Sequence, residues 1–232
     1  MTKGPVAEGL GRVEELSDAG EYEAALAELD RQLESHPFEP AVHTARGWAL
    51  ENLGTSELPQ ARKAYSRALE LDPTALWAKE GLSNVHRRMG NFGEADRLAR
   101  EVIDEGTPRS DLEIDLLELI GWCQLRLGEY DDAVKTLRRA LELDGRWTAV
   151  RFDLALALMF VGDRSRAFLE YQRGVHQAVN GGVERLRGVV RMGLDDLEEC
   201  LAERPALAST REAIAARDLL RSTLRAATRS AS

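Results

Sequence analysis

Apolar residues recur along the chain at the spacing of one helix face, and glycines interrupt them at regular distances. Around Gly90 the apolar positions are three and four residues apart: Leu82, Val85 and Met89 before it, and Ala95, Leu98, Ala99 and Val102 after it. This spacing predicts two helices, and glycine readily adopts the left-handed backbone conformation that ends a helix. The segment therefore predicts a pair of antiparallel helices that turn at Gly90.

The same unit occurs five times along the chain. Turn glycines stand at positions 20, 54, 90, 128 and 162, which are 34 to 38 residues apart. A small residue follows each of them within seven positions, at Ala25, Ala61, Ala95, Ala133 and Ala167. A period near 34 residues is typical of helix-turn-helix solenoids, in which each unit packs on its neighbours. Residues 1–178 are therefore expected to form about five helix pairs of an all-α solenoid.

Three stretches of the chain resemble tetratricopeptide repeats: GEYEAALAEL from Gly20, ARKAYSRALELDP from Ala61 and GEYDDAVKTLRRALELD from Gly128. The resemblance covers residues 6 to 178. The chain departs from the family pattern in lacking a tryptophan early in the first helix of each repeat, and it carries a two-residue insertion around Thr55 to Pro59. The resemblance implies a right-handed superhelix whose concave groove, lined by the first helix of each repeat, holds peptides or partner helices.

Helical periodicity places one stripe of each first helix on this groove. The stripes are Thr44, Trp48, Glu51 and Asn52; Trp77, Glu80, Asn84, Arg87 and Arg88; Asp115, Glu118, Trp122 and Arg126; and Phe152, Leu156, Met159 and Phe160. From them we select twelve candidate binding residues: Trp48, Asn52, Trp77, Asn84, Arg87, Arg88, Trp122, Arg126, Phe152, Leu156, Met159 and Phe160. No catalytic, metal-binding or cofactor-binding residue is expected.

Three of the four tryptophans fall on these stripes. Tryptophan is concentrated at binding hot spots because it buries a large surface and keeps one hydrogen-bond donor. The alternative is that the tryptophans only fill space against one another or against the carboxyl-terminal helices. Arg87, Arg88 and Arg126 lie between Trp77 and Trp122 on the stripes, and arginine pairs bidentately with carboxylates. These arginines are expected to receive an acidic group of a partner, with solvated surface arginines as the alternative.

The expected groove changes character along its length. Glu14, Ser17 and Asp18 make its amino-terminal end acidic, whereas Phe152 and Phe160 help to make the far end apolar. Such a gradient would orient a partner helix of opposite polarity. Some members of the family hold the carboxylate terminus of chaperones in a clamp of lysines and asparagines. Only Asn84 has a comparable place here, so that function is disfavoured.

Two more helices are expected after Asn180, where Gly181 and Gly182 break the pattern. Their apolar faces carry Val183, Leu186, Val190, Leu194, Leu197 and Leu201 in the first, and Ala213, Ala216, Leu220 and Leu224 in the second. Because a solenoid needs its last repeat covered, residues 179–232 are expected to be capping or accessory helices with a basic tail. Three arrangements stay open: a cap on the stack, a cover over the apolar groove end, or a dimer interface.

Composition further reduces the number of protein classes to which the chain could belong. The net charge of -9 argues against a general nucleic-acid binder, because neutralising phosphates needs a basic surface. Cys123 and Cys200 form no CxxC or Cys/His motif and are expected to be free buried thiols. The longest apolar run has eight residues, Leu154 to Val161, so no membrane insertion is expected, and with no secretory signal at the start we expect a cytoplasmic protein.

The sequence therefore predicts a non-enzymatic interaction module or adaptor that binds a peptide or helix of another protein in its groove. The four histidines have no metal-ligand or nucleophile spacing, and the chain has no glycine-rich phosphate loop. No cofactor is expected. The alternative is a structural scaffold that self-assembles, as a homodimer or larger oligomer, through the groove or the carboxyl-terminal helices.

Overall fold

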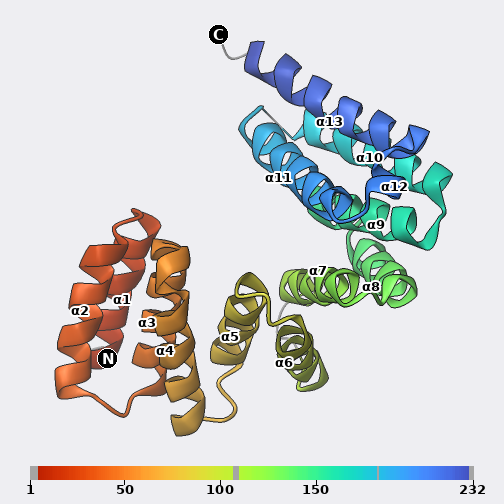
Figure 1. Cartoon of the computed structure of the whole chain (residues 1–232). Helices are drawn as coiled ribbons and strands as arrows, with labels where there is room; N and C mark the ends of the chain where they lie inside the picture. Colours follow the sequence, from red (N-terminus) through yellow and green to blue (C-terminus); the bar gives the residue numbers. More distant parts are fainter. Residues whose placement is uncertain (1–4, 107–109, 182, 230–232) are drawn as a thin grey trace. The chain divides into compact units, whose positions relative to one another are not determined.

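The computed structural model describes residues 5–106, 110–181 and 183–229, and every regular element in these ranges is helical (Figure 1). The chain divides into two compact units, Met1–Thr107 and Pro108–Ser232. This division follows the density of contacts and falls between two helix pairs. The division expected at residues 178 and 179, between repeats and accessory helices, stays a prediction. Each unit is described by itself below.

The first unit contains three helix pairs. They are α1 (Pro5–Asp18) with α2 (Tyr22–Ser35), α3 (Pro40–Leu53) with α4 (Leu58–Leu71), and α5 (Leu76–Arg88) with α6 (Phe92–Asp104). A short 3-10 helix, η1 (Thr55–Glu57), occupies the insertion between α3 and α4. Gly90 has φ +79° between α5 and α6, as the sequence predicts for a turn glycine.

Tyr65 of α4 holds the middle of the first unit together. Its side chain is 1% exposed and lies against Gly47 of α3 and Gly81 of α5. A Cβ atom added at Gly47 would come within 2.7 Å of the Tyr65 ring, so the two glycines make room for the tyrosine. The phenol hydroxyl donates a hydrogen bond to Glu51 of α3 at 3.2 Å. Tyr65 thereby joins the first helices of two successive pairs.

The second unit contains two further pairs and the carboxyl-terminal helices. The pairs are α7 (Ser110–Leu127) with α8 (Tyr130–Leu143), and α9 (Thr148–Val161) with α10 (Arg164–Asn180). They are followed by α11 (Val183–Ala202), the four-residue α12 (Pro205–Ala208) and α13 (Arg211–Arg229). The predicted all-α class is confirmed, and α11 and α13 are the two helices expected after residue 180.

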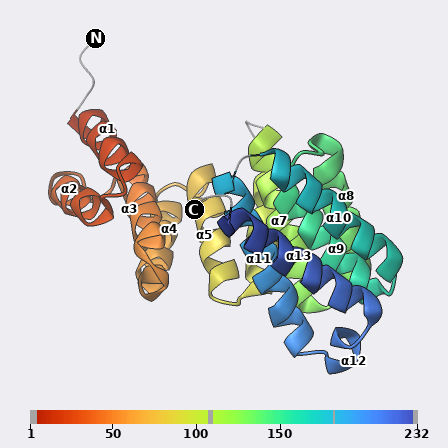
Figure 2. The ribbon, with the colours of Figure 1, turned by 90° about the horizontal axis from the view of Figure 1, so that it is seen from above.

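The carboxyl-terminal helices pack on the last helix pair of their own unit. Helix α11 contacts α9 and α10, while α13 lies beside α11 and contacts α10 (Figures 1 and 2). The predicted apolar faces are buried at Leu186, Val190, Leu194, Leu197 and Leu201 of α11 and at Ala213, Ala216 and Leu220 of α13. Both faces are covered within the chain, which combines the first two of the three arrangements left open by the sequence.

Candidate functional site

The first unit carries a groove along its first helices. The groove has a volume of about 750 Å³. It is lined by Leu10, Val13, Glu14, Ser17 and Asp18 at α1; Glu39, Pro40, Ala41, Thr44, Ala45 and Trp48 at α3; Tyr65 of α4; and Asp72, Ala75, Leu76, Trp77 and Glu80 at α5. We call this surface the first-unit groove. Its volume is within the range of natural ligand sites.

Two predicted tryptophans lie in the first-unit groove with a large part of each ring open. Trp48 is 42% exposed and Trp77 is 49% exposed. The Trp48 ring meets Tyr22, the second residue after the first turn glycine, in an edge-to-face contact with centroids 5.8 Å apart. This contact fixes one side of the indole, since aromatic pairs favour edge-to-face geometry. The open indole faces are available for contact with another molecule.

Tyr65, which lines the groove, belongs to a partly buried polar cluster with Glu51 and Arg88. Burial raises the pKa of the Glu51 carboxyl, and Arg88 opposes this shift. Arg88 donates a hydrogen bond to the backbone oxygen of Glu51 at 2.8 Å and lies 3.6 Å from its carboxylate. Burial also raises the pKa of Tyr65, with the charges of Glu51 and Glu80 adding to the effect. Glu51, Tyr65 and Arg88 are therefore held by one another within the unit.

Carboxylates dominate the polar lining of the first-unit groove. Five of the seventeen lining residues are acidic and none is lysine, arginine or histidine: Glu14, Asp18, Glu39, Asp72 and Glu80. Hydrogen bonds from the hydroxyl and backbone N–H of Thr74 lower the pKa of Asp72, so this group stays ionised. Periodicity had indicated Glu14, Asp18 and Glu80. Glu39 and Asp72 precede helices rather than lying on a stripe, and sequence reasoning missed both.

The other first-unit candidates lie outside this lining. Asn52 is exposed and donates a hydrogen bond to the backbone oxygen of Trp48 at 2.8 Å, while Asn84 donates to the Glu80 carboxylate. Arg87 is half-buried, and Arg88 is engaged by Glu51 as described above. Two asparagines and Arg88 therefore have partners within the unit. Among the candidates, only Trp48 and Trp77 line the first-unit groove.

In the second unit, three of the four apolar candidates are core residues. Phe152 is 2% exposed, and Leu156 and Met159 are each 1% exposed. The Phe152 ring lies against Gly174 of α10 and Gly193 of α11. Their expected place on an open groove is wrong for this structure, because α11 packs over α9 and buries them. Helix α9 is apolar on all sides, and such a helix must be covered on all sides.

Arg126 of α7 is also occupied within the second unit. Its guanidinium lies 2.7 Å from the Glu199 carboxylate of α11 and 3.6 Å from that of Glu203. Arg126 was expected to receive an acidic group from a partner. In the structure it pairs with acidic residues of its own chain instead. Trp122, one helical turn earlier, is half-buried. Trp122 and Arg126 belong to the second unit, and Trp77, Arg87 and Arg88 to the first.

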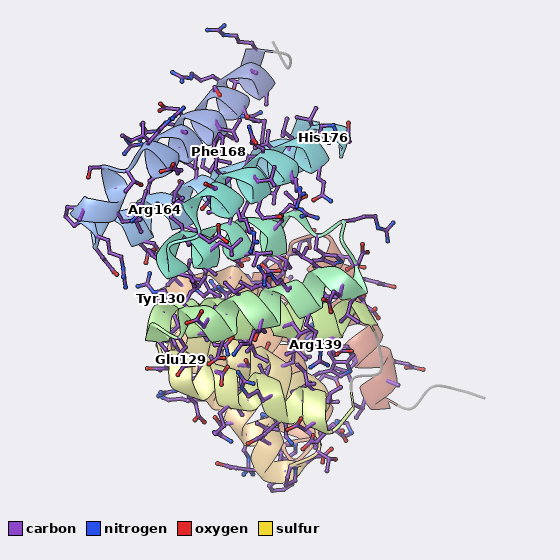
Figure 3. All side chains as sticks on the ribbon, turned by 90° about the vertical axis from the view of Figure 1, so that its right-hand side faces the viewer. Glu129, Tyr130, Arg139, Arg164, Phe168 and His176 are labelled. Atoms are coloured by element: carbon purple, nitrogen blue, oxygen red, sulfur yellow. The ribbon has the colours of Figure 1, made fainter. Side chains whose placement is uncertain are left out.

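Phe160, the last candidate, is half-buried in an aromatic cluster. Its ring is 5.1 Å from that of Tyr130, and the Arg204 guanidinium lies over both rings, 4.6 Å from the Phe160 centroid. Arg204 also donates a hydrogen bond to the Tyr130 hydroxyl. Figure 3 shows Tyr130 at the end of α8 opposite Arg139, on the same side of the unit as Arg164. An arginine over an aromatic face is a favourable arrangement, so this end is also covered from within.

Several other features of the described residues bear on the expected chemistry. Among the described residues, no three histidine, cysteine, aspartate or glutamate side chains are grouped to hold a metal ion. Cys123 and Cys200 are buried free thiols, as expected, and burial raises the pKa of Cys200 to about 11. No helix in the described ranges has the length and apolar character needed to cross a bilayer.

Comparison with solved structures finds the same fold in other proteins. A MamA RS-1 ArsTM double mutant superposes with a TM-score of 0.67 at 16% identity, over 78% of this chain and 98% of that one. MamA 41-end from Desulfovibrio magneticus RS-1 gives 0.66 at 15% identity, over 76% and 97%. YrrB, described as a TPR protein with an unusual peptide-binding site, gives 0.55 at 21% identity, over 82% and 97%. At these identities the likeness shows the fold alone.

Family models agree with the repeats read from the sequence. No curated protein matches the chain. Two models described as tetratricopeptide repeat match residues 10–76 and 74–145, which together are more than half of the chain. The number of repeats and the right-handed superhelix stay predictions. The chain belongs to the tetratricopeptide-repeat family.

Proposed function

We propose that the protein is a non-enzymatic adaptor that holds a segment of another protein in the first-unit groove. Tetratricopeptide-repeat proteins bind other proteins or peptides, and YrrB is described as having a peptide-binding site. The groove of about 750 Å³ is the described surface of this chain that best suits such a role. The proposal places the function in the first unit.

The exposed pair Trp48 and Trp77 carries the proposal. Large aromatic side chains on a soluble surface mark interaction sites when they stand together in a concave patch. Both indoles line the same groove, and nearly half of each is open. The matching surface of the second unit is covered by α11, so its apolar residues are occupied by the fold.

A peptide library selected on the full chain tests this proposal without assuming the partner's chemistry. Random twelve-residue peptides are displayed, and binders are compared between the native chain and Trp77→Ala. Replacing a true hot spot is expected to weaken binding by about 2 kcal/mol, roughly 30-fold. Because the side chain is 49% exposed, the free energy of unfolding should change by under about 1 kcal/mol.

Phe38→Ala is the matched control for Trp77→Ala. Phe38 is an aromatic residue of the same unit, 72% exposed, that does not line the groove. Its removal should leave the selected peptides bound as before. The proposal fails if no peptide is selected, or if the selected peptides bind Trp77→Ala as well as they bind the native chain.

A further inference from the structure

We propose that the first-unit groove selects a segment rich in lysine or arginine, whose cationic side chains lie against Trp48 and Trp77 and between the acidic residues. This inference rests on the proposed function and names the chemistry of the partner. It reverses the earlier expectation of an acidic partner. The occupant is a segment of another protein, extended or helical, that carries positive charge and some apolar residues.

Three of the five acidic residues that line the groove carry negative charge that no group in the described ranges neutralises. The side chains of Glu14, Asp18 and Glu39 make no hydrogen bond or ion pair with any side chain or backbone group in the described ranges. No lysine, arginine or histidine lines the groove. A concave surface lined by one sign of charge focuses the field and raises the local concentration of ions of opposite sign. The groove therefore attracts cations and repels acidic segments.

The two open tryptophans also favour a cationic side chain. Indole has the most favourable aromatic face for a cation, and an ammonium or guanidinium within about 6 Å of the ring is attracted to it. Lysine and arginine also cover apolar surface with their aliphatic stems while the charged head reaches a carboxylate. Arg204 over Phe160 and Tyr130 shows the same arrangement inside this chain. The combination of open indoles and nearby carboxylates fits a lysine or arginine side chain.

Two of the three arginines first expected to bind acids are already engaged within the chain. Arg88 is held by Glu51 and Arg126 by Glu199 and Glu203. An acidic partner would have to break these contacts in exchange for new ones of the same kind. A cationic partner makes contacts that the fold leaves open.

The groove's width sets the length of a useful probe. It is lined by residues of α1, α3 and α5. Packed helices are about 8–10 Å apart, so three of them span about 20 Å, the length of about six extended residues. Ten-residue peptides with blocked termini are therefore long enough to fill it.

The test compares three fluorescent ten-residue peptides that differ only in the polar residue alternating with leucine, which is lysine, glutamine or glutamate. Binding to the full chain is followed by anisotropy at about 0.05 M and about 0.5 M salt. We expect the lysine peptide to bind about tenfold more tightly than the glutamine peptide, and the glutamate peptide to bind most weakly. The lysine preference should shrink at the higher salt, where screening shortens the reach of charges to a few ångströms.

Paired charge variants locate the effect. Glu14→Gln with Asp18→Asn removes two charges from the groove, and Glu23→Gln with Glu34→Gln removes two from the exposed face of α2. The groove pair should weaken the lysine peptide about tenfold, and the α2 pair less than twofold. Equal effects of the two pairs would overturn the inference, because they would show a response to net charge alone.

Three other outcomes also overturn it, each in a distinguishable way. If the glutamine or glutamate peptide binds as tightly as the lysine peptide and still needs Trp77, the proposed function stands and the cationic partner does not. A synthetic peptide with the sequence of α13, Arg211–Arg229, tests a second copy of the chain as the occupant. If it binds more tightly than the lysine peptide and light scattering shows a dimer, the groove serves self-association. If no peptide binds in this test or in the library selection, both proposals fall.

Discussion

The first unit leaves the surface of its first helices open, whereas the second unit covers the surface of α9 with a helix from its own carboxyl end. Both units are built from the same kind of helix pair with a turn glycine. In the first unit, Trp48 is 42% exposed beside Tyr22. In the second unit, Phe160 beside Tyr130 has Arg204 lying over it. The same type of aromatic contact is thus open in one unit and closed in the other.

The difference follows from the composition of the first helices. Helix α5 mixes Trp77 with Glu80 and Asn84, so its outer side is stable in water. Helix α9 is apolar from Leu154 to Met159, and its buried residues lie on all of its sides. An all-apolar helix must be covered within the protein. The comparison shows that the repeat pattern sets the helix pairs, while the polarity of each first helix decides whether its surface is available for binding.

The largest expected effect comes from removing a covered aromatic side chain. Phe152→Ala leaves a cavity between α9, α10 and α11 and should lower the free energy of unfolding by about 3–5 kcal/mol. Urea denaturation followed by circular dichroism measures it, with Trp77→Ala as the half-exposed counterpart. If Phe152→Ala costs no more than Trp77→Ala, α11 does not cover α9 and the contrast between the units is lost.

Two glycines of α11 provide a second test of whether this helix packs on Phe152 of α9. A Cβ added at Gly193 would come within 2.5 Å of the Phe152 ring, whereas one added at Gly188 would meet nothing within 4 Å. Gly193→Ala should therefore destabilise the protein by about 1–3 kcal/mol through overpacking. Gly188→Ala should stabilise it by about 0.5–1 kcal/mol, because alanine favours helix. Thermal denaturation that shifts in the same direction for both would contradict the packing of α11 on Phe152.

Cys200 reports on the contact between α11 and α7 at alkaline pH. Burial raises its pKa from 9.0 to about 11, and the Arg126 charge partly opposes this. Between these two values the folded state holds more protons than the unfolded state, so the free energy of unfolding should fall as the pH rises from 9 to 11. The full contribution is present below pH 9. Subtracting the profile of Cys200→Ala isolates this effect from the tyrosines, and identical profiles would show that the thiol is not buried.

The smallest expected change in the free energy of unfolding comes from removing an ion pair, such as the one that Arg126 makes with α11. Arg126 is 18% exposed and Glu199 is 59% exposed, so solvent screens the pair. Arg126→Gln should change the free energy of unfolding by under about 1 kcal/mol, as should Arg88→Gln in the open unit. Arg126→Gln should also raise the pKa of Cys200 further, because it removes a nearby cation. A loss of several kcal/mol for Arg126→Gln alone would mean that charge rather than apolar burial holds α11 in place.

Local capping chemistry follows less directly from sequence spacing than the helices themselves do. Asn91 and Glu94 have the spacing of a capping box, yet the Asn91 side chain makes no capping bond and Glu94 pairs with Arg97. Ser209 and Glu212 have the same spacing, yet Thr210 rather than Ser209 accepts the hydrogen bond from the Ala213 backbone N–H, at 3.4 Å. Ser110, in a third such pair, lies outside the described side chains. Capping depends on which nearby side chain forms the hydrogen bond to the free backbone N–H groups, and sequence spacing alone does not reveal this.

About half of the candidate site could be read from periodicity. Trp48, Trp77, Glu14, Asp18 and Glu80 lie on helix faces, so a period near 3.6 residues places them correctly. Glu39 and Asp72 approach the groove from the segments before α3 and α5, where no period applies. Periodicity places Phe152, Leu156 and Met159 on a surface because the helix that covers them, α11, is a separate and later segment of the sequence.

The sequence by itself determined the elements of this protein. Its repeated glycines, apolar spacing and small residues specify the paired helices, because these signals act between residues close in the chain. Only the tertiary structure decided which helix faces stay open. Tyr65 fits between Gly47 and Gly81, and α11 folds back on Phe152, through contacts between residues far apart in sequence. Such contacts depend on the fit of whole surfaces, which determines that the first unit keeps a groove and the second fills its own.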